Sequence, residues 1–127
     1  MRNFCIAEKL NLEDKEKIFD FLVGLIDGKL ILDKNQILRD VRLYESVKGG
    51  KCAVFGPVSV HTAKTSGVRE FCMTGAIFNN RIELMILWDD ISEPHLDRLS
   101  EIARQLGKIK DSEAPLEEII VELQKIS

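Results

Sequence analysis

The sequence predicts a domain of the α/β (α+β) class with three layers, in which a mixed β-sheet carries helices on both faces. Residues that favour β-structure are concentrated between positions 52 and 88, and amphipathic helical patterns come before and after them. Residues 81–88, "RIELMILW", are apolar almost without interruption, which is typical of a central strand covered on both faces. A chain of 127 residues fits one such domain, so we expect a single domain over residues 1–127.

The first third of the chain predicts one short strand and two helices. Residues 3–7, "NFCIA", alternate weakly between polar and apolar and indicate the strand. Apolar residues at helical spacing follow, with Asn11 as the expected cap and Gly28 as the expected end of the first helix. The second helix is expected over residues 33–47, because Asp33 and the glutamine three residues later resemble a capping box.

The middle of the chain predicts a series of strands bounded by glycine, proline or asparagine. The expected strands are residues 52–55, 58–60, 70–78 and 81–88. The last two form a hairpin in "IFNNRIEL", since asparagine tolerates the positive φ angles that a tight turn requires.

The last third of the chain predicts two more helices. Ser92 is the expected cap of the first, with Pro94 in its first turn and Gly107 near its end. The second begins near Pro115 and carries an apolar stripe. Together with the first two helices, these cover both faces of the expected sheet.

Composition and charge narrow the classes of function. The net charge of −3 argues against non-specific nucleic-acid binding, which requires a basic face. No apolar run is long enough for a membrane span, and the acidic start does not resemble a signal peptide, so we expect a cytoplasmic protein. The cysteines Cys5, Cys52 and Cys72 are odd in number and far apart, which favours small buried side chains over a disulfide framework or a zinc knuckle.

The two histidines are the candidate chemical groups. His61 follows "GPVSV" at an expected strand end and precedes the loop "TAKTSG", where a neutral imidazole would serve as a nucleophile or base. The alternative is a partly buried structural histidine. His95 is expected in the first turn of the third helix, where backbone N–H groups favour an anion such as phosphate. The alternative for His95 is a solvated helix face, and we interpret Asp89 and Asp90 as turn residues.

Three stretches resemble one protein family. "GPVSVH" ends in His61, "HLDRLSEIARQL" begins with His95, and "APLEEIIVELQ" lies in the expected last helix. In this order they resemble the fructose/mannitol-type enzyme IIA family, type 2, of the bacterial phosphoenolpyruvate-dependent sugar phosphotransferase system. The resemblance covers nearly the whole chain. It departs from the family at Val60, where the family has a proline, and in the region of Arg39 and Arg42, where the family has an Arg–Glu pair.

The resemblance implies a phosphoryl carrier. His61 would accept the phosphoryl group from the histidine of the phosphocarrier HPr and pass it to a cysteine of a sugar-specific enzyme IIB. His95 and Arg42 would stabilise the charge of the group in transfer. To share one phosphoryl group, the imidazoles of His61 and His95 would have to lie within about 10 Å of each other, since hydrogen bonds reach only ~3 Å. The resemblance implies no cofactor, no metal and no nucleic acid, and contact with a membrane only through a permease partner.

Two alternatives to transport remain. Two departures from the family favour a regulatory IIA-like module that keeps the fold and signals by binding. They are Val60 in place of the proline and the lack of the Arg–Glu pair near Arg39 and Arg42. The other alternative is a small-molecule-binding domain with a pocket between His61 and His95. Phosphorylation with phosphoenolpyruvate, enzyme I and HPr distinguishes the carrier from both.

Overall fold

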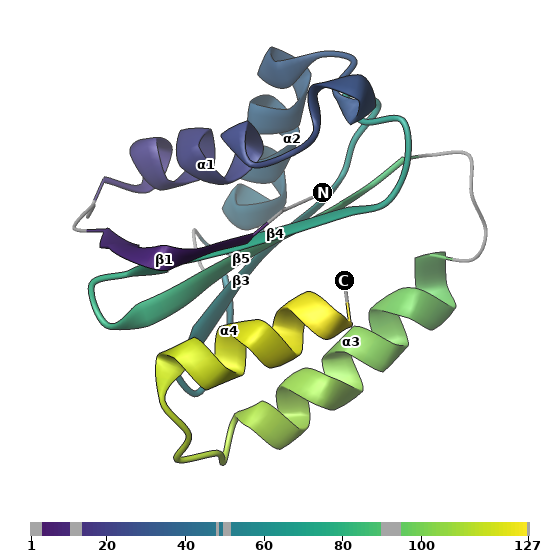
Figure 1. The fold of residues 1–127 in the computed structure, drawn as a ribbon. Coiled ribbons are helices and arrows are strands. Elements are labelled where there is room, and N and C mark those ends of the chain that lie inside the picture. The colour runs from purple at the N-terminus through teal and green to yellow at the C-terminus, as the bar shows by residue number, and fades with distance from the viewer. Residues whose placement is uncertain (1–3, 11–13, 48, 50–51, 90–94, 127) are drawn as a thin grey trace.

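The chain folds into three layers, with one mixed sheet between two pairs of helices (Figure 1). The structure is a computed structural model and describes residues 4–10, 14–47, 49, 52–89 and 95–126. The elements are β1 (Phe4–Leu10), α1 (Lys15–Gly24), the 3₁₀ turn η1 (Gly28–Leu30), α2 (Lys34–Val47), β2 (Ala53–Phe55), β3 (Val58–Lys64), β4 (Cys72–Phe78), β5 (Arg81–Trp88), α3 (His95–Ile109) and α4 (Leu116–Lys125). Helices α1 and α2 cover one face and α3 and α4 the other, which confirms the predicted fold class.

The strand β5 lies at the centre of the sheet, as its apolar sequence predicts. The spatial order is β1-β4-β5-β3-β2. β5 pairs antiparallel with β4 and parallel with β3, while β1 is parallel to β4 and β2 is antiparallel to β3. Five of the eight residues of β5 are buried and the other three are partly buried.

Alternation along the strands separates two cores. On β3, Val58 and Val60 join the cluster under α3 and α4, whereas Ala63 joins the cluster under α1 and α2. Because successive side chains of a strand point to opposite faces, Ser59 and His61 also face α1 and α2. Ser59 and His61 thus share one face with Ala63, whereas Thr62 and Lys64 alternate to the face of Val58 and Val60.

The helix boundaries follow local capping. Helix α1 begins behind Asp14, whose side chain accepts a hydrogen bond from the Glu16 N–H at 2.9 Å, and the expected cap Asn11 lies outside the described residues. The helix ends at Gly24, one turn earlier than expected. The predicted cap of α2 is confirmed, since the Asp33 carboxylate accepts from the Gln36 N–H at 3.1 Å. None of the helices in the described part of the chain has the length and apolar composition needed to cross a membrane.

The hairpin between β4 and β5 is confirmed, but the predicted end of β3 is wrong. Asn79 and Asn80 take positive φ angles of 49° and 67°, which suit a tight two-residue turn. β3 does not stop at residue 60. It runs to Lys64 because it pairs residue for residue with β5, up to the pair Lys64–Trp88. His61 therefore lies in the middle of a strand and not at the edge of a loop.

Candidate functional site

His61 is buried between two carboxylates. Its side chain is only 4% exposed. Ring atom Nδ1 contacts Oε1 of Glu45, which comes from the last turn of α2. Ring atom Nε2 lies 3.2 Å from Oε2 of Glu83 on β5. Both ring nitrogens therefore have an acidic partner.

The local fold explains why these three side chains meet. In the parallel pair of β3 and β5, Ser59 lies opposite Glu83 and His61 lies opposite Met85, so Glu83 and His61 share the face under α1 and α2. Glu45 lies one helical turn after Val41, on the side of α2 that is buried against the sheet. The ring of Phe19 from α1 meets the imidazole edge-on, with 5.0 Å between the ring centroids.

The electrostatics favour a charged imidazole. Burial opposes the charged form of His61, but the hydrogen bonds to Glu45 and Glu83 outweigh it and raise its pKa above the ordinary value of 6.5. Burial likewise works against the Glu45 carboxylate, yet its bonds to His61 and to the Lys15 ammonium hold the pKa of that carboxyl below its ordinary value. The result is a row of alternating charges formed by Lys15, Glu45, His61 and Glu83.

This arrangement has a chemical consequence for His61. An imidazolium that donates from both ring nitrogens has no free lone pair, so it is not a nucleophile in this state. The sequence predicted an exposed neutral ring at a strand end, and the structure instead buries the ring on the sheet face that α1 and α2 cover. The reason is that β3 continues past His61 through its pairing with β5. The buried structural histidine, which the sequence left open as an alternative, describes the observed environment.

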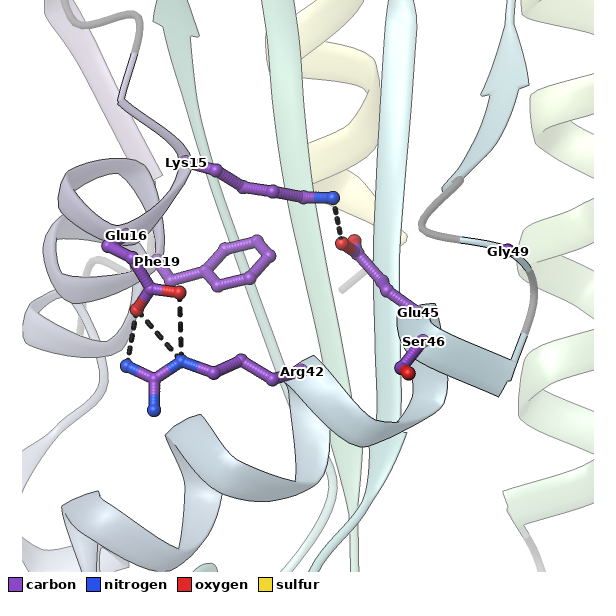
Figure 2. Close-up of a pocket in the computed structure, with 7 residues that line it drawn as sticks. All are labelled: Lys15, Glu16, Phe19, Arg42, Glu45, Ser46 and Gly49. Carbon is purple, nitrogen blue, oxygen red and sulfur yellow. Dashed lines mark hydrogen bonds and ion pairs between the residues drawn. The ribbon is translucent and has the colours of Figure 1, made fainter.

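An open depression of about 370 Å³ lies beside this cluster. It is lined by Lys15, Glu16, Phe19, Arg42, Glu45, Ser46 and Gly49. Figure 2 shows the Lys15 ammonium directed at Glu45 and the Arg42 guanidinium directed at Glu16. Two lining residues, Phe19 and Glu45, also contact the His61 ring, although His61 does not itself line the depression.

The predicted arginine, Arg42, lies near this site, and its hydrogen bonds go to Glu16. Arg42 forms a two-pronged contact with the exposed carboxylate of Glu16, with Nε 2.8 Å from each of its oxygens. The hydrogen bond to Glu16 raises the pKa of the guanidinium. Arg39, the other candidate, donates to the side chain of Gln36 at 2.7 Å. Arg42 therefore shares a depression with Glu45 and Phe19, and it is these two residues, not Arg42, that contact His61.

The predicted second histidine begins helix α3, as expected from the sequence. The side chain of His95 and the expected cap Ser92 lie outside the described residues. Helix α3 packs on the face opposite to that of the His61 ring. Because the His95 side chain is not among the described residues, a phosphate site shared by His61 and His95 stays a prediction. Asp89 is buried just after β5, and Asp90 lies outside the described residues.

The cysteines occupy different environments. Cys72 is buried, as predicted, and burial raises its pKa to about 11. Cys52 is only half-buried, in the connection between α2 and β2, and burial together with nearby Glu45 and Glu83 raises the pKa of its thiol. The side chain of Cys5 lies outside the described residues. The donor atoms of Cys52, Glu45 and His61 all lie within 4.8 Å of one another.

Sequence reasoning missed the two glutamates, although each left a signal. Glu83 is the one charged residue inside the otherwise apolar run "IELMILW". Glu45 continues the buried stripe of α2, four residues after Val41. An acidic residue on a buried stripe requires a partner, and a histidine on a neighbouring strand provides one.

Comparison with known proteins relates the fold to the IIA class. No protein-family model matches the chain, and no curated protein matches it in sequence. Among solved structures, the chain is similar to the nitrogen regulatory protein IIA-Ntr from Neisseria meningitidis, with a TM-score of 0.61 and 13% identity. The likeness covers 97% of this chain and 94% of that one. It shows that the chain has the fold of a IIA protein in general, and it does not single out the fructose/mannitol type.

Proposed function

We propose that residues 1–127 form a single IIA-like regulatory module that acts by binding other proteins, with His61 as a buried structural cation. The observation that carries this proposal is the occupation of both His61 ring nitrogens by Glu45 and Glu83. A phosphoryl acceptor needs an accessible lone pair in line with the donor phosphorus. In this module the ring supplies neither access nor a lone pair.

The partner class that fits this module is the phosphocarrier HPr, with enzyme IIB and, through a permease, the membrane as further candidates. The support is the likeness in fold to a IIA protein. The surface on which we expect contact is the depression between α1 and α2, since it brings the exposed side chains of Lys15, Glu16 and Arg42 together. A mixed surface of this kind suits a protein partner, and we expect the module to work in the cytoplasm.

A second function, phosphoryl transfer at His61 as in the fructose/mannitol type, is favoured by one observation. The Lys15 ammonium contacts Glu45, the residue that covers one ring nitrogen, and the Arg42 guanidinium lines the same depression. Transfer would require Glu45 to move away and the ring to lose one proton to a carboxylate. The freed nitrogen would then form the N–P bond while the N–P bond of phospho-HPr breaks. His95 would assist.

One experiment separates these functions. The protein is incubated with phosphoenolpyruvate, enzyme I and HPr, and its intact mass and its amide NMR spectrum are recorded. For the regulatory module we expect an unchanged mass, with HPr-dependent shifts in the amides around Lys15, Arg42 and Ser46. An acid-labile phosphoryl adduct that disappears in His61→Ala would establish the second function instead. If neither the mass nor the spectrum changes, both proposals are wrong.

A further inference from the structure

Three donor atoms of different kinds converge beside the depression. They are a carboxylate oxygen of Glu45, the thiol sulfur of Cys52 and a ring nitrogen of His61. These residues are seven and nine positions apart in the sequence, and the spacing of the cysteines alone pointed away from a zinc knuckle. The fold brings them together because the last turn of α2, the connection that follows it and the strand β3 meet at one place.

We propose that Glu45, Cys52 and His61 form a binding site for a thiophilic divalent cation of the zinc type. Sulfur, imidazole nitrogen and carboxylate oxygen are the donors that Zn²⁺ binds in proteins, at about 2.3, 2.0–2.1 and 2.0–2.2 Å. Hard cations such as Mg²⁺ and Ca²⁺ prefer oxygen donors only, so the thiol selects against them. This proposal does not depend on the regulatory function above.

The geometry is close to that of a metal site. Around a tetrahedral zinc ion, donor atoms lie about 3.3–3.8 Å apart, as follows from the bond lengths. The donor atoms lie within 4.8 Å of one another, so the wider pairs close by about 1 Å, while the directly hydrogen-bonded Glu45–His61 pair opens to admit the ion. Both movements are within the reach of side-chain rotation. Cys52 is the donor best able to move, because it is half-buried and lies outside the helices and strands.

Neighbouring residues already hold the donors in place. Glu83 bonds one ring nitrogen of His61 and fixes the orientation of the ring, and Lys15 bonds the second oxygen of Glu45. Such outer partners orient metal ligands and strengthen binding. Three protein donors leave the fourth position of a tetrahedral ion for water or for a group from a partner.

Charge balance is also preserved when the ion binds. Without metal, the carboxylates of Glu45 and Glu83 are offset by the Lys15 ammonium and the His61 imidazolium, beside a neutral Cys52 thiol. Binding of Zn²⁺ releases one proton from the thiol and one from the imidazolium to solvent. The thiolate sulfur and the neutral ring nitrogen then bond to the metal. The net charge of the cluster is therefore the same before and after binding.

The test uses the full chain, reduced and freed of metal by a chelator. Addition of Co²⁺, a spectroscopic substitute for Zn²⁺, should produce a thiolate-to-metal charge-transfer band in the near ultraviolet that saturates at one ion per chain. Zn²⁺ should then displace Co²⁺ and abolish the band. Cys52→Ser should remove the charge-transfer band and weaken Zn²⁺ binding by at least about 10–100-fold, the loss that even an outer partner typically causes.

Cys72→Ala is the matched control. Its thiol is buried and donates to the backbone carbonyl of Glu70, outside the donor cluster, so the band should persist. Glu45→Gln offers a second variant of nearly the same shape, and it should weaken Zn²⁺ binding without removing the thiolate band. The proposal is overturned by the absence of a saturable band, by a band that survives Cys52→Ser, or by one that is lost in Cys72→Ala. None of these measurements involves HPr, so their failure is distinct from a failure of the partner binding that the regulatory proposal predicts.

Discussion

The core of the sheet face under α3 and α4 is built from apolar side chains, whereas the core under α1 and α2 mixes apolar residues with buried polar ones. Val58, Val60, Ile82, Leu84 and Ile86 from β3 and β5 lie on the first face. On the second face, the same two strands contribute Ser59, His61 and Glu83. Both faces are well covered by helices (Figure 1).

The difference teaches how each face is stabilised. Burial of aliphatic groups is non-directional and scales with the area removed from water. A buried charge is tolerated only where each partner is present and correctly placed. The apolar face therefore depends on volume, and the polar face depends on the pairing of Glu45, His61 and Glu83. The polar face is therefore also the one that offers side chains able to bind an ion, as proposed for Glu45, Cys52 and His61.

The largest effect should come from the apolar face. Leu84 is fully buried in the central strand, so Leu84→Ala removes buried methyl groups and leaves a cavity. We expect a loss of about 4 kcal/mol in the free energy of unfolding, measured by urea denaturation. Val121→Ala on α4, at a side chain that is 37% exposed, should stay within about 0.5 kcal/mol. Similar losses for the two variants would mean that the apolar face is not a packed core.

A smaller but still large effect should come from the ion-pair row. Glu45→Ala leaves His61 and Lys15 without their shared carboxylate, and the broken buried pair should cost about 3 kcal/mol in the free energy of unfolding. The control is Glu16→Ala, which removes the exposed partner of Arg42 and should hardly move the urea midpoint. A midpoint for Glu45→Ala equal to that of the control would show that the buried row contributes nothing to stability.

The polar face should also make stability depend on pH. The raised His61 pKa contributes stability that is complete below the ordinary value of 6.5 and is lost as the pH rises through the raised value. The lowered Glu45 pKa contributes stability that is complete above 4.5 and is lost as the pH falls through the lowered value. Together they place the maximum of this contribution between 4.5 and 6.5.

Thermal unfolding across that range and up to about pH 9 measures this dependence. A His95→Gln background removes the other histidine of the chain, and the raised thiol pKa values of Cys52 and Cys72 contribute equally with and without His61, so the part of the alkaline decline that a change at His61 removes belongs to His61. The further change His61→Gln should flatten the decline. A decline of the same size in both proteins would show that His61 is not charged in the folded state.

The sequence predicts the fold better than it predicts the site. The central strand "RIELMILW", the Asn79–Asn80 turn and the Asp33 cap depend on neighbours within a few residues, and all three are confirmed. The length of β3 depends instead on β5, more than 20 residues away in the chain. Nothing next to His61 in the sequence records that pairing, so the strand end and the exposed ring were predicted wrongly.

The site is a product of long-range contacts. Glu45 and Glu83 lie 16 and 22 residues from His61 along the chain. Their acidic side chains on apolar stripes indicate that some buried cation exists, but they do not say which one. Cys52 has still less to mark it, because its role depends on where the connection after α2 places it. Which side chains surround His61 is therefore known only from the folded structure.

The smallest predicted effect concerns an unpaired hydroxyl on the polar face. The Thr74 Oγ1 atom is buried and has no hydrogen-bond partner among the described residues, so Thr74→Val should stabilise the protein by about 1 kcal/mol. Thr65 is the matched control, because it is equally buried but its Oγ1 accepts a hydrogen bond from the Gly67 N–H at 3.1 Å. Thr65→Val, the same change of shape, should destabilise by about 1–3 kcal/mol because it leaves that N–H unpaired. Urea midpoints that move in opposite directions would show that pairing, and not polarity, decides the cost on this face. Destabilisation by both changes would mean that the Thr74 hydroxyl has a partner.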